Sequence, residues 1–121
     1  MIGYTTLGTN DLEKATAFYD QLFSDMDAKK MFDTETFVGW QLGQGAMFSI
    51  TKPYDKNEAT VGNGVMIALK VDGPATVDAL HAKAMSLGAA NEGDPGERIE
   101  GFYAGYFRDL DGNKLNFFSY G

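Results

Sequence analysis

Apolar and polar positions at the start of the chain predict a strand followed by an amphipathic helix. Residues 2–8 have the composition of a short strand, and Thr9-Asn10-Asp11 supplies side chains that cap helix N-termini. Beyond this cap, apolar side chains recur at helical spacing, at Leu12, Ala15, Phe18, Tyr19 and Leu22. We therefore expect one strand and then one helix.

Three short apolar segments then predict antiparallel strands. Residues 28–32, 36–42 and 46–51 are rich in aromatic and β-branched side chains, which favour strands. They are separated by Asp33 and by the Gly43–Gly45 segment, both typical of turns. The first part of the chain thus has the order βαβββ.

The second part of the chain repeats this order. After a polar connector, residues 65–71 predict a strand, Asp72-Gly73-Pro74 predicts a helix start, and Gly88 predicts the end of that helix. Further strands are expected near 90–92, 103–109 and 114–120, with a charged loop at 93–101 and a turn at Asp111-Gly112. Each copy is too small to bury a core easily, so we expect both copies to pack together.

The repeat predicts an α+β fold made of two βαβββ modules in tandem. The modules span about 1–52 and 64–121, joined by a linker at about 53–63, and together form a single domain, 1–121. One helix per four strands covers only one face of a sheet, so the other face is free to curve around a ligand or a partner. We expect a curved, barrel-like mixed sheet with the helices outside.

Two motifs resemble those of the vicinal oxygen chelate superfamily. The first is TTLGTNDLEKATAFYDQLF at 5–23, and the second is YFRDLDGNKL at 106–115, with Leu110 where the family usually has proline. The resemblance covers the whole chain. It implies the doubled βαβββ fold, a homodimer and a small-molecule ligand. The superfamily includes glyoxalases, ring-cleaving dioxygenases, epimerases and proteins that sequester bleomycin-type compounds, so the fold does not decide the function.

Composition removes several kinds of chemistry. The 121 residues include one His and no Cys, which excludes disulfides, a thiolate nucleophile and a metal site built on several histidines. The net charge of −7 argues against nucleic acid or an anionic membrane as partners. No apolar stretch predicts a signal peptide or a membrane span, so we expect a cytoplasmic protein.

The resemblance also identifies where a metal ion would lie. Metal-using members of the superfamily place one ligand, typically His or Glu, on each of four concave strands. The matching positions here hold Tyr4, Ser49, Met66 and Asn116. These side chains are weak ligands for a first-row metal at neutral pH. We predict that the site holds no metal and no other cofactor.

Alternation within the strands selects the side chains of the concave face. In 46–51, Phe48 and Ile50 are expected to face the helix, and Ser49 the concavity. The ligand-binding candidates are Tyr4, Trp40 or its neighbours, Met47, Ser49, Met66, Tyr106, Arg108, Asn116 and Phe118. They predict an apolar pocket with a few hydrogen-bonding groups. Arg108 is the cation expected to meet a carboxylate or phosphate.

We favour a glyoxalase/bleomycin-resistance-like protein that binds a small, partly aromatic or amphipathic molecule in the concave cavity without a metal ion, and whether it catalyses a reaction stays open. One alternative is a glyoxalase-like lyase or isomerase. It would either recruit carboxylates from elsewhere in the chain or use Tyr4 or Tyr106 as acid or base, and the second route requires a cation to lower the phenol pKa. Another is a protein-interaction or regulatory module with an exposed apolar patch. His81 is expected at the surface or boundary of the second helix, and the 93–101 loop is either solvated chain or a lid.

Overall fold

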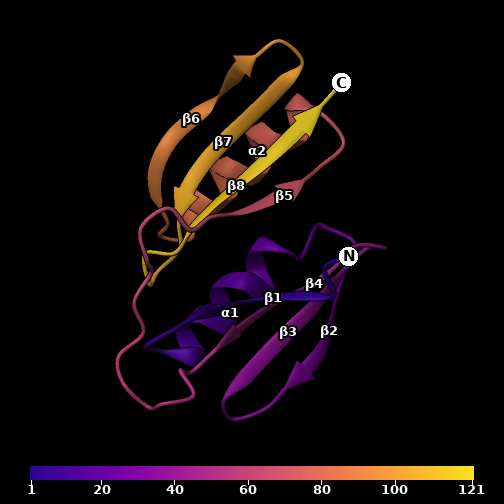
Figure 1. Cartoon of the computed structure of the whole chain (residues 1–121). Helices are drawn as coiled ribbons and strands as arrows, with labels where there is room; N and C mark the ends of the chain where they lie inside the picture. The colour runs from indigo at the N-terminus through magenta and orange to yellow at the C-terminus, as the bar shows by residue number, and fades with distance from the viewer. The chain divides into compact units, whose positions relative to one another are not determined.

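The computed structural model describes all residues, 1–121, and divides into two compact units, Met1–Val61 and Gly62–Gly121. Each unit has one helix and four strands (Figure 1). The N-terminal unit holds β1 (Tyr4–Gly8), α1 (Leu12–Leu22), β2 (Ala28–Asp33), β3 (Phe37–Leu42) and β4 (Met47–Thr51). The C-terminal unit holds β5 (Ile67–Lys70), α2 (Pro74–Ser86), β6 (Ala90–Ile99), β7 (Phe102–Arg108) and β8 (Lys114–Tyr120). The predicted α+β class and the doubled βαβββ order are confirmed.

Both sheets have the same strand order. The N-terminal sheet runs β1-β4-β3-β2 and the C-terminal sheet runs β5-β8-β7-β6. In each, the first strand of the unit is parallel to the last one, and the remaining pairs are antiparallel. The mixed character is as predicted. The single barrel-like sheet is not, because every strand pair lies within one repeat and the result is two separate four-stranded sheets.

Helix α1 begins where the sequence supplies a capping side chain. The carboxylate of Asp11 accepts a hydrogen bond from the Lys14 backbone N–H at 3.1 Å, which satisfies one of the free donors of the first turn. The buried face of the helix is the predicted one, with Ala15, Phe18, Tyr19 and Leu22. Tyr19 packs on Phe48 of β4, with ring centroids 4.8 Å apart. The helix therefore covers the side of the sheet that carries Phe48.

A proline at the start and a glycine just after the end determine the limits of helix α2. Pro74 occupies the first turn, where its missing N–H costs nothing, and Gly88 has φ +102° just beyond the helix. The helix buries Val77, Leu80, His81 and Ala84. It packs on β7 and β8, whose buried side chains include Phe107 and Phe117. Neither helix has the length and apolar composition that crossing a membrane requires.

His81 is buried, and the prediction that it lies at the surface or boundary is wrong. Its side chain is 4% exposed, and Nε2 lies 3.0 Å from the backbone oxygen of Tyr106 on β7. A Cβ at Gly105 would stand 3.0 Å from both His81 Cδ2 and Pro95 Cγ. The missing side chain of Gly105 thus makes the space that the imidazole fills.

Residues 93–101 do not form the predicted loop. They belong mostly to β6, a ten-residue strand at the edge of the sheet that pairs with β7. The register shifts between Asn91 and Gly93, between Gly93 and Gly96, and between Glu97 and Ile99. These irregularities allow glycine, proline and charged residues into a strand, which is why the sequence pattern indicated a loop. A paired strand gives no basis for a lid.

The connector begins as part of the N-terminal unit. The side chain of Asn10 donates a hydrogen bond to the Ala59 carbonyl at 3.2 Å and accepts one from the Ala59 N–H at 2.7 Å. A Cβ at Gly8 would lie 3.0 Å from Ala59 Cβ, so the connector passes close to β1. The boundary between the units, after Val61, falls inside the predicted linker.

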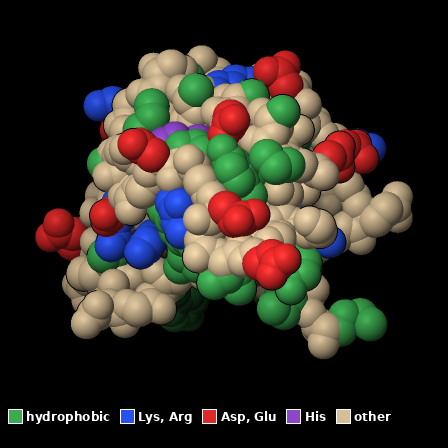
Figure 2. Space-filling model, turned by 90° about the horizontal axis from the view of Figure 1, so that it is seen from above, with side chains coloured by type: hydrophobic (Ala, Val, Ile, Leu, Met, Phe, Trp, Pro, Cys, Tyr) green, Lys and Arg blue, Asp and Glu red, His purple; other side chains and the backbone are tan.

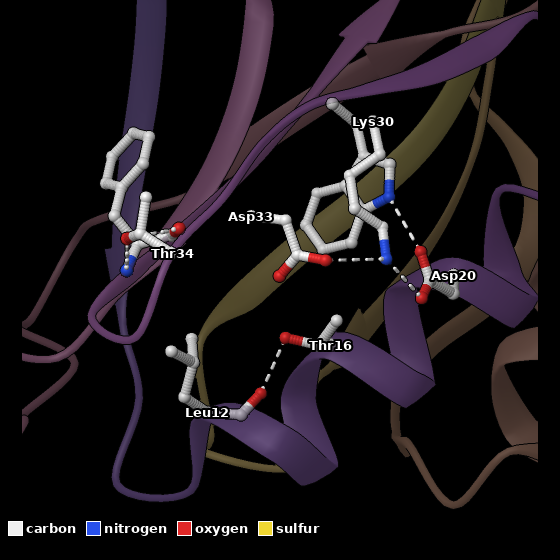
Figure 3. Close-up of polar contacts among 8 residues, drawn as sticks. Leu12, Thr16, Asp20, Lys30, Asp33 and Thr34 are labelled. Carbon is white, nitrogen blue, oxygen red and sulfur yellow. Dashed lines mark hydrogen bonds and ion pairs between the residues drawn. The ribbon is translucent and has the colours of Figure 1, made fainter.

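Charged side chains tie the outer strand of the N-terminal sheet to α1. Lys30 Nζ on β2 lies 2.9 Å from Asp20 Oδ2 and 3.7 Å from Asp33 Oδ2 (Figure 3). The hydrogen bond that Lys30 donates to Asp20, together with the negative charges of both carboxylates, raises the pKa of Lys30. In the view of Figure 2, acidic side chains are scattered, and hydrophobic side chains are exposed between them.

Candidate functional site

The face of the N-terminal sheet opposite α1 carries three of the predicted site residues. Strand pairing places Tyr4 beside Met47, and Thr6 beside Ser49. Phe48, which alternates with them on β4, packs on Tyr19 of α1. Tyr4, Met47 and Ser49 therefore lie on what we call the N-terminal helix-free face, as alternation predicts.

This face is mainly apolar and aromatic. The ring of Tyr4 makes an edge contact with Phe37 at 6.4 Å, and Phe37 makes another with Phe32 at 6.1 Å. Tyr4 and Phe32 are 61% and 50% exposed. Ser49 is fully buried, and its hydroxyl donates a hydrogen bond to the Thr5 carbonyl. The hydroxyl proton of Ser49 is thus already used within the sheet.

Trp40 lies on the other side of the same sheet. It is buried, its indole N–H donates a hydrogen bond to Asp20 Oδ1 of α1 at 3.0 Å, and its ring packs on Phe23. Its neighbours Gly39 and Gln41 occupy the helix-free face, paired with Ser49 and Met47. Alternation in the sequence did not determine which residues of β3 face the helix. The hydrogen bond to Asp20 shows that Trp40 is one of them.

The face of the C-terminal sheet opposite α2 brings together most of the remaining candidates. Tyr106 and Asn116 are directly paired, as are Ala104 and Phe118. The alternate residues of β7 face the helix: Gly105 lies against His81, and the Tyr103 hydroxyl donates a hydrogen bond to Asp78 of α2 at 2.7 Å. That hydrogen bond raises the pKa of Tyr103. We call the opposite side the C-terminal helix-free face.

Two cations approach the ring of Tyr106 on this face. Arg98 Cζ lies 5.3 Å and Lys114 Nζ 5.6 Å from the ring centroid, both within the range of cation–π attraction. Arg98 also donates a hydrogen bond to the Asp94 carbonyl at 2.6 Å. Neither cation was among the residues predicted for the site. Arg98 was assigned to a loop, whereas Lys114 could have been found because it lies two residues before Asn116 on the same strand.

Arg108, the predicted anion-binding residue, is already engaged. Its Nε lies 2.5 Å from Glu92 Oε1, and its Nη1 donates a hydrogen bond to the Gly112 carbonyl at 3.0 Å. The hydrogen bond from Arg108 and its positive charge lower the pKa of Glu92. Arg108 is thus ion-paired with a carboxylate of this chain. It therefore adds less net positive charge to the face than Arg98 or Lys114 does.

Asn116 has an unsatisfied polar atom. Its side chain is 1% exposed, and Oδ1 has no hydrogen-bond partner. Its Nδ2 lies 4.0 Å from Met66 Sδ, a weak acceptor. Because a buried amide oxygen without a donor is costly, this atom marks a place where a donor is missing.

Aromatic rings continue along the face beyond Asn116. Phe118 stacks on Phe102 with ring centroids 5.4 Å apart and an interplanar angle of 26°. Tyr120 lies 6.2 Å from Phe102. The face therefore combines flat apolar rings, two cations without a carboxylate partner and one free hydrogen-bond acceptor. Such a surface suits a planar, anionic organic molecule.

The residues at the family's metal positions do not fit a divalent metal. Tyr4 and Ser49 lie in the N-terminal unit, Met66 and Asn116 in the C-terminal unit, and none is a strong ligand. The Ser49 hydroxyl donates within its own sheet. No group of three or more His, Asp or Glu side chains is placed to hold a metal ion.

Two open hollows lie in the N-terminal unit. One, of about 650 Å³, is lined by acidic residues around the start of α1, among them Glu13 and Glu35. The other, of about 760 Å³, lies along the connector beside Lys52 and Tyr54. Neither contains a residue predicted for the site.

Comparisons with known proteins agree with the motifs. The sequence model of the Glyoxalase/Bleomycin resistance protein/Dioxygenase superfamily matches residues 1–117. No curated protein matches the chain. Among solved structures, a glyoxalase/bleomycin resistance protein from Albidiferax ferrireducens is 30% identical with a TM-score of 0.91, over 100% of this chain and 99% of that one.

Two further structures have the same fold. A hypothetical protein from S. aureus is 30% identical with a TM-score of 0.77, over 98% of this chain and 92% of its own. A family enzyme from Burkholderia phytofirmans is 20% identical with a TM-score of 0.81, over 98% of both chains. The motifs, the doubled βαβββ units and these matches agree: the chain belongs to the glyoxalase/bleomycin resistance protein/dioxygenase superfamily.

Proposed function

We propose that this protein binds a small organic molecule on the C-terminal helix-free face without the help of a metal ion. The observation that carries the proposal is the arrangement around Tyr106, where two cations and the unpaired Asn116 amide surround one aromatic ring. Phe118 and Met66 add apolar surface beside it. Arg108 with Glu92 forms the polar border of the site.

The proposal extends to the remaining candidates and to the assembly. Tyr4, Met47 and Ser49 are proposed to offer a contact surface of their own for small molecules on the N-terminal helix-free face, where the exposed rings are apolar. A homodimer in the cytoplasm is proposed from the resemblance to superfamily members of this length. No cofactor is proposed, because the ligand set at the family's metal positions is weak.

Amide NMR spectra of the labelled protein test the binding site. A panel of neutral and charged aromatic compounds should shift the amide signals of β7 and β8 around Tyr106 and Asn116. Tyr106→Leu should weaken binding about tenfold, because it removes the ring that the cations flank. Tyr54→Leu is the matched control, since Tyr54 is fully exposed in the connector and should leave binding unchanged. If no compound shifts signals on this face, the proposal is wrong.

A second candidate function is a glyoxalase-like lyase or isomerase. The observation that favours it is that Arg98 and Lys114 lie against the ring of Tyr106, so two cations stand beside a residue predicted from the sequence as an acid or base. Turnover of methylglyoxal and glutathione that disappears in Tyr106→Phe would establish this function. Turnover that survives the substitution would assign the chemistry to other groups.

A further inference from the structure

The charges of the C-terminal unit are unevenly distributed between its two sides. Its basic residues are Lys70, Lys83, Arg98, Arg108 and Lys114. Lys83 lies on α2, whereas Arg98 and Lys114 contact Tyr106 and Lys70 pairs with Phe118 on the helix-free face. In a chain with net charge −7, one sheet face has thus gathered four of the five cations of its unit. Such a local excess of positive charge attracts an anion.

Only one of these cations is matched by a carboxylate. Arg108 forms an ion pair with Glu92. Arg98 and Lys114 rest against the Tyr106 ring and form no ion pair with a carboxylate, although the charge of Lys114 helps to lower the pKa of Glu92. An incoming carboxylate would meet both N–H donors without first having to displace a carboxylate of the protein.

Next to these cations, the face offers a hydrogen-bond acceptor. Asn116 is paired directly with Tyr106, so the two side chains start about 5 Å apart on the same face. The unpartnered Oδ1 requires an N–H or O–H, which neither a carboxylate nor an apolar ring supplies. The required donor therefore belongs to a different part of the ligand from the anionic group.

Met66 lies beside the amide group that carries this acceptor. Its Sδ lies 4.0 Å from Asn116 Nδ2, and the side chain is 40% exposed at the residue just before β5. An unbranched, half-exposed methionine changes rotamer easily. It can move aside when a ligand brings a donor to Asn116 and can pack against the ligand afterwards.

We infer that the ligand is a planar aromatic carboxylate that carries an O–H or N–H donor away from its carboxylate. Arg98 and Lys114 bind the carboxylate, Asn116 Oδ1 accepts from the donor, and the ring lies among Tyr106, Met66 and Phe118. This inference rests on the proposed function and adds the ligand class to it.

Four probes of nearly equal size separate the two requirements. They are 4-hydroxybenzoate, which has the charge and the donor; 4-methoxybenzoate, which has the charge only; 4-hydroxybenzamide, which keeps the hydroxyl donor without the charge; and 4-methoxybenzamide, which lacks both the charge and the hydroxyl. Dissociation constants are measured from amide NMR titrations of the wild-type protein. We expect 4-hydroxybenzoate to bind about tenfold more tightly than 4-methoxybenzoate and than 4-hydroxybenzamide, in line with one hydrogen bond and one charged contact.

Two variants assign these preferences to residues. Asn116→Leu should remove the advantage of hydroxyl over methoxy, and Lys114→Gln should reduce the advantage of carboxylate over amide. Lys83→Gln makes the same charge change on α2 and should alter neither. The wild-type comparison stands even if Asn116→Leu fails to fold.

The outcomes separate the inference from the proposed function. Equal binding of all four probes on this face would overturn the ligand class and leave small-molecule binding in place. Signal shifts only elsewhere, or none at all, would overturn both. Preferences that persist in both variants would overturn the assignment to Asn116 and Lys114.

Discussion

At the scale of single residues, the orientation and availability of a side chain depend more on its hydrogen-bond and ion-pair partners than on its position in the apolar–polar pattern. Trp40 or its neighbours, and Arg108, were predicted to face a ligand. Trp40 donates its indole N–H to Asp20 on the helix side of the sheet, whereas Arg108 lies on the predicted face and binds Glu92 there. The nature of each side chain was visible in the sequence, but its partner was not, because both partners lie 16 or more positions away.

The pair of Arg108 and Glu92 makes a prediction about titration. Because the folded pKa of Glu92 is lowered below its ordinary value of 4.5, the pair stabilises the fold above that pH, and this contribution is lost as the pH falls through the lowered pKa. In Arg108→Gln, the pKa of Glu92 should rise towards 4.5. Carbon-13 NMR of the Glu92 carboxyl group measures the change.

The control for this titration is Arg98→Gln, which removes a nearby cation that does not contribute to the lowered pKa of Glu92. It should leave the Glu92 curve in place. An unchanged curve in Arg108→Gln would contradict the assignment of the shift to the ion pair.

At the scale of elements, helices and strands were predicted correctly where one face of the element is buried and the other is not. Both helices were recognised from their apolar spacing and their end signals, and β4 from the alternation of Phe48 and Ile50. β6 was missed because its register shifts break the period on which strand prediction depends. Arg98, which lies on β6, was not predicted as a site residue for the same reason.

The contact between α2 and β7 depends on one missing side chain. Gly105→Ala places a Cβ 3.0 Å from both the His81 ring and Pro95, so we expect a loss of about 1–3 kcal/mol in the free energy of unfolding. Thermal and denaturant unfolding measure this loss. Gly3→Ala is the control, because a Cβ at Gly3 meets no atom within 4 Å. Equal stability of the two variants would show that the helix moves away from β7 at little cost.

At the scale of the whole molecule, the family match and the side chains at its metal positions point in different directions. The chain belongs to the superfamily, yet the positions at which the resemblance implies metal ligands hold Tyr4, Ser49, Met66 and Asn116. Fold was predictable from the repeat and the motifs. The site was predictable only in part, since cation–ring contacts and an unpaired amide appear only when strands are placed side by side.

Titration calorimetry tests whether this protein binds a divalent metal ion. Ni²⁺, Zn²⁺, Mn²⁺ and Fe²⁺ added separately to the protein should give no stoichiometric binding, because phenol, hydroxyl, thioether and amide groups are weak ligands. Asn116→His together with Met66→His introduces two imidazoles and should create measurable Zn²⁺ affinity. Binding to the wild-type protein at micromolar or lower concentration would mean that other carboxylates supply the site.

The irregular register of β6 also affects how the molecule meets other chains. As an edge strand, β6 has one side without a neighbour in its sheet, which usually invites another strand to pair with it. Here Pro95 has no N–H to offer, and three register shifts interrupt the even row of donors and acceptors that a new strand would need. The longest strand of the protein is therefore a poor template for aggregation, and the same bends that place Arg98 over Tyr106 protect this edge.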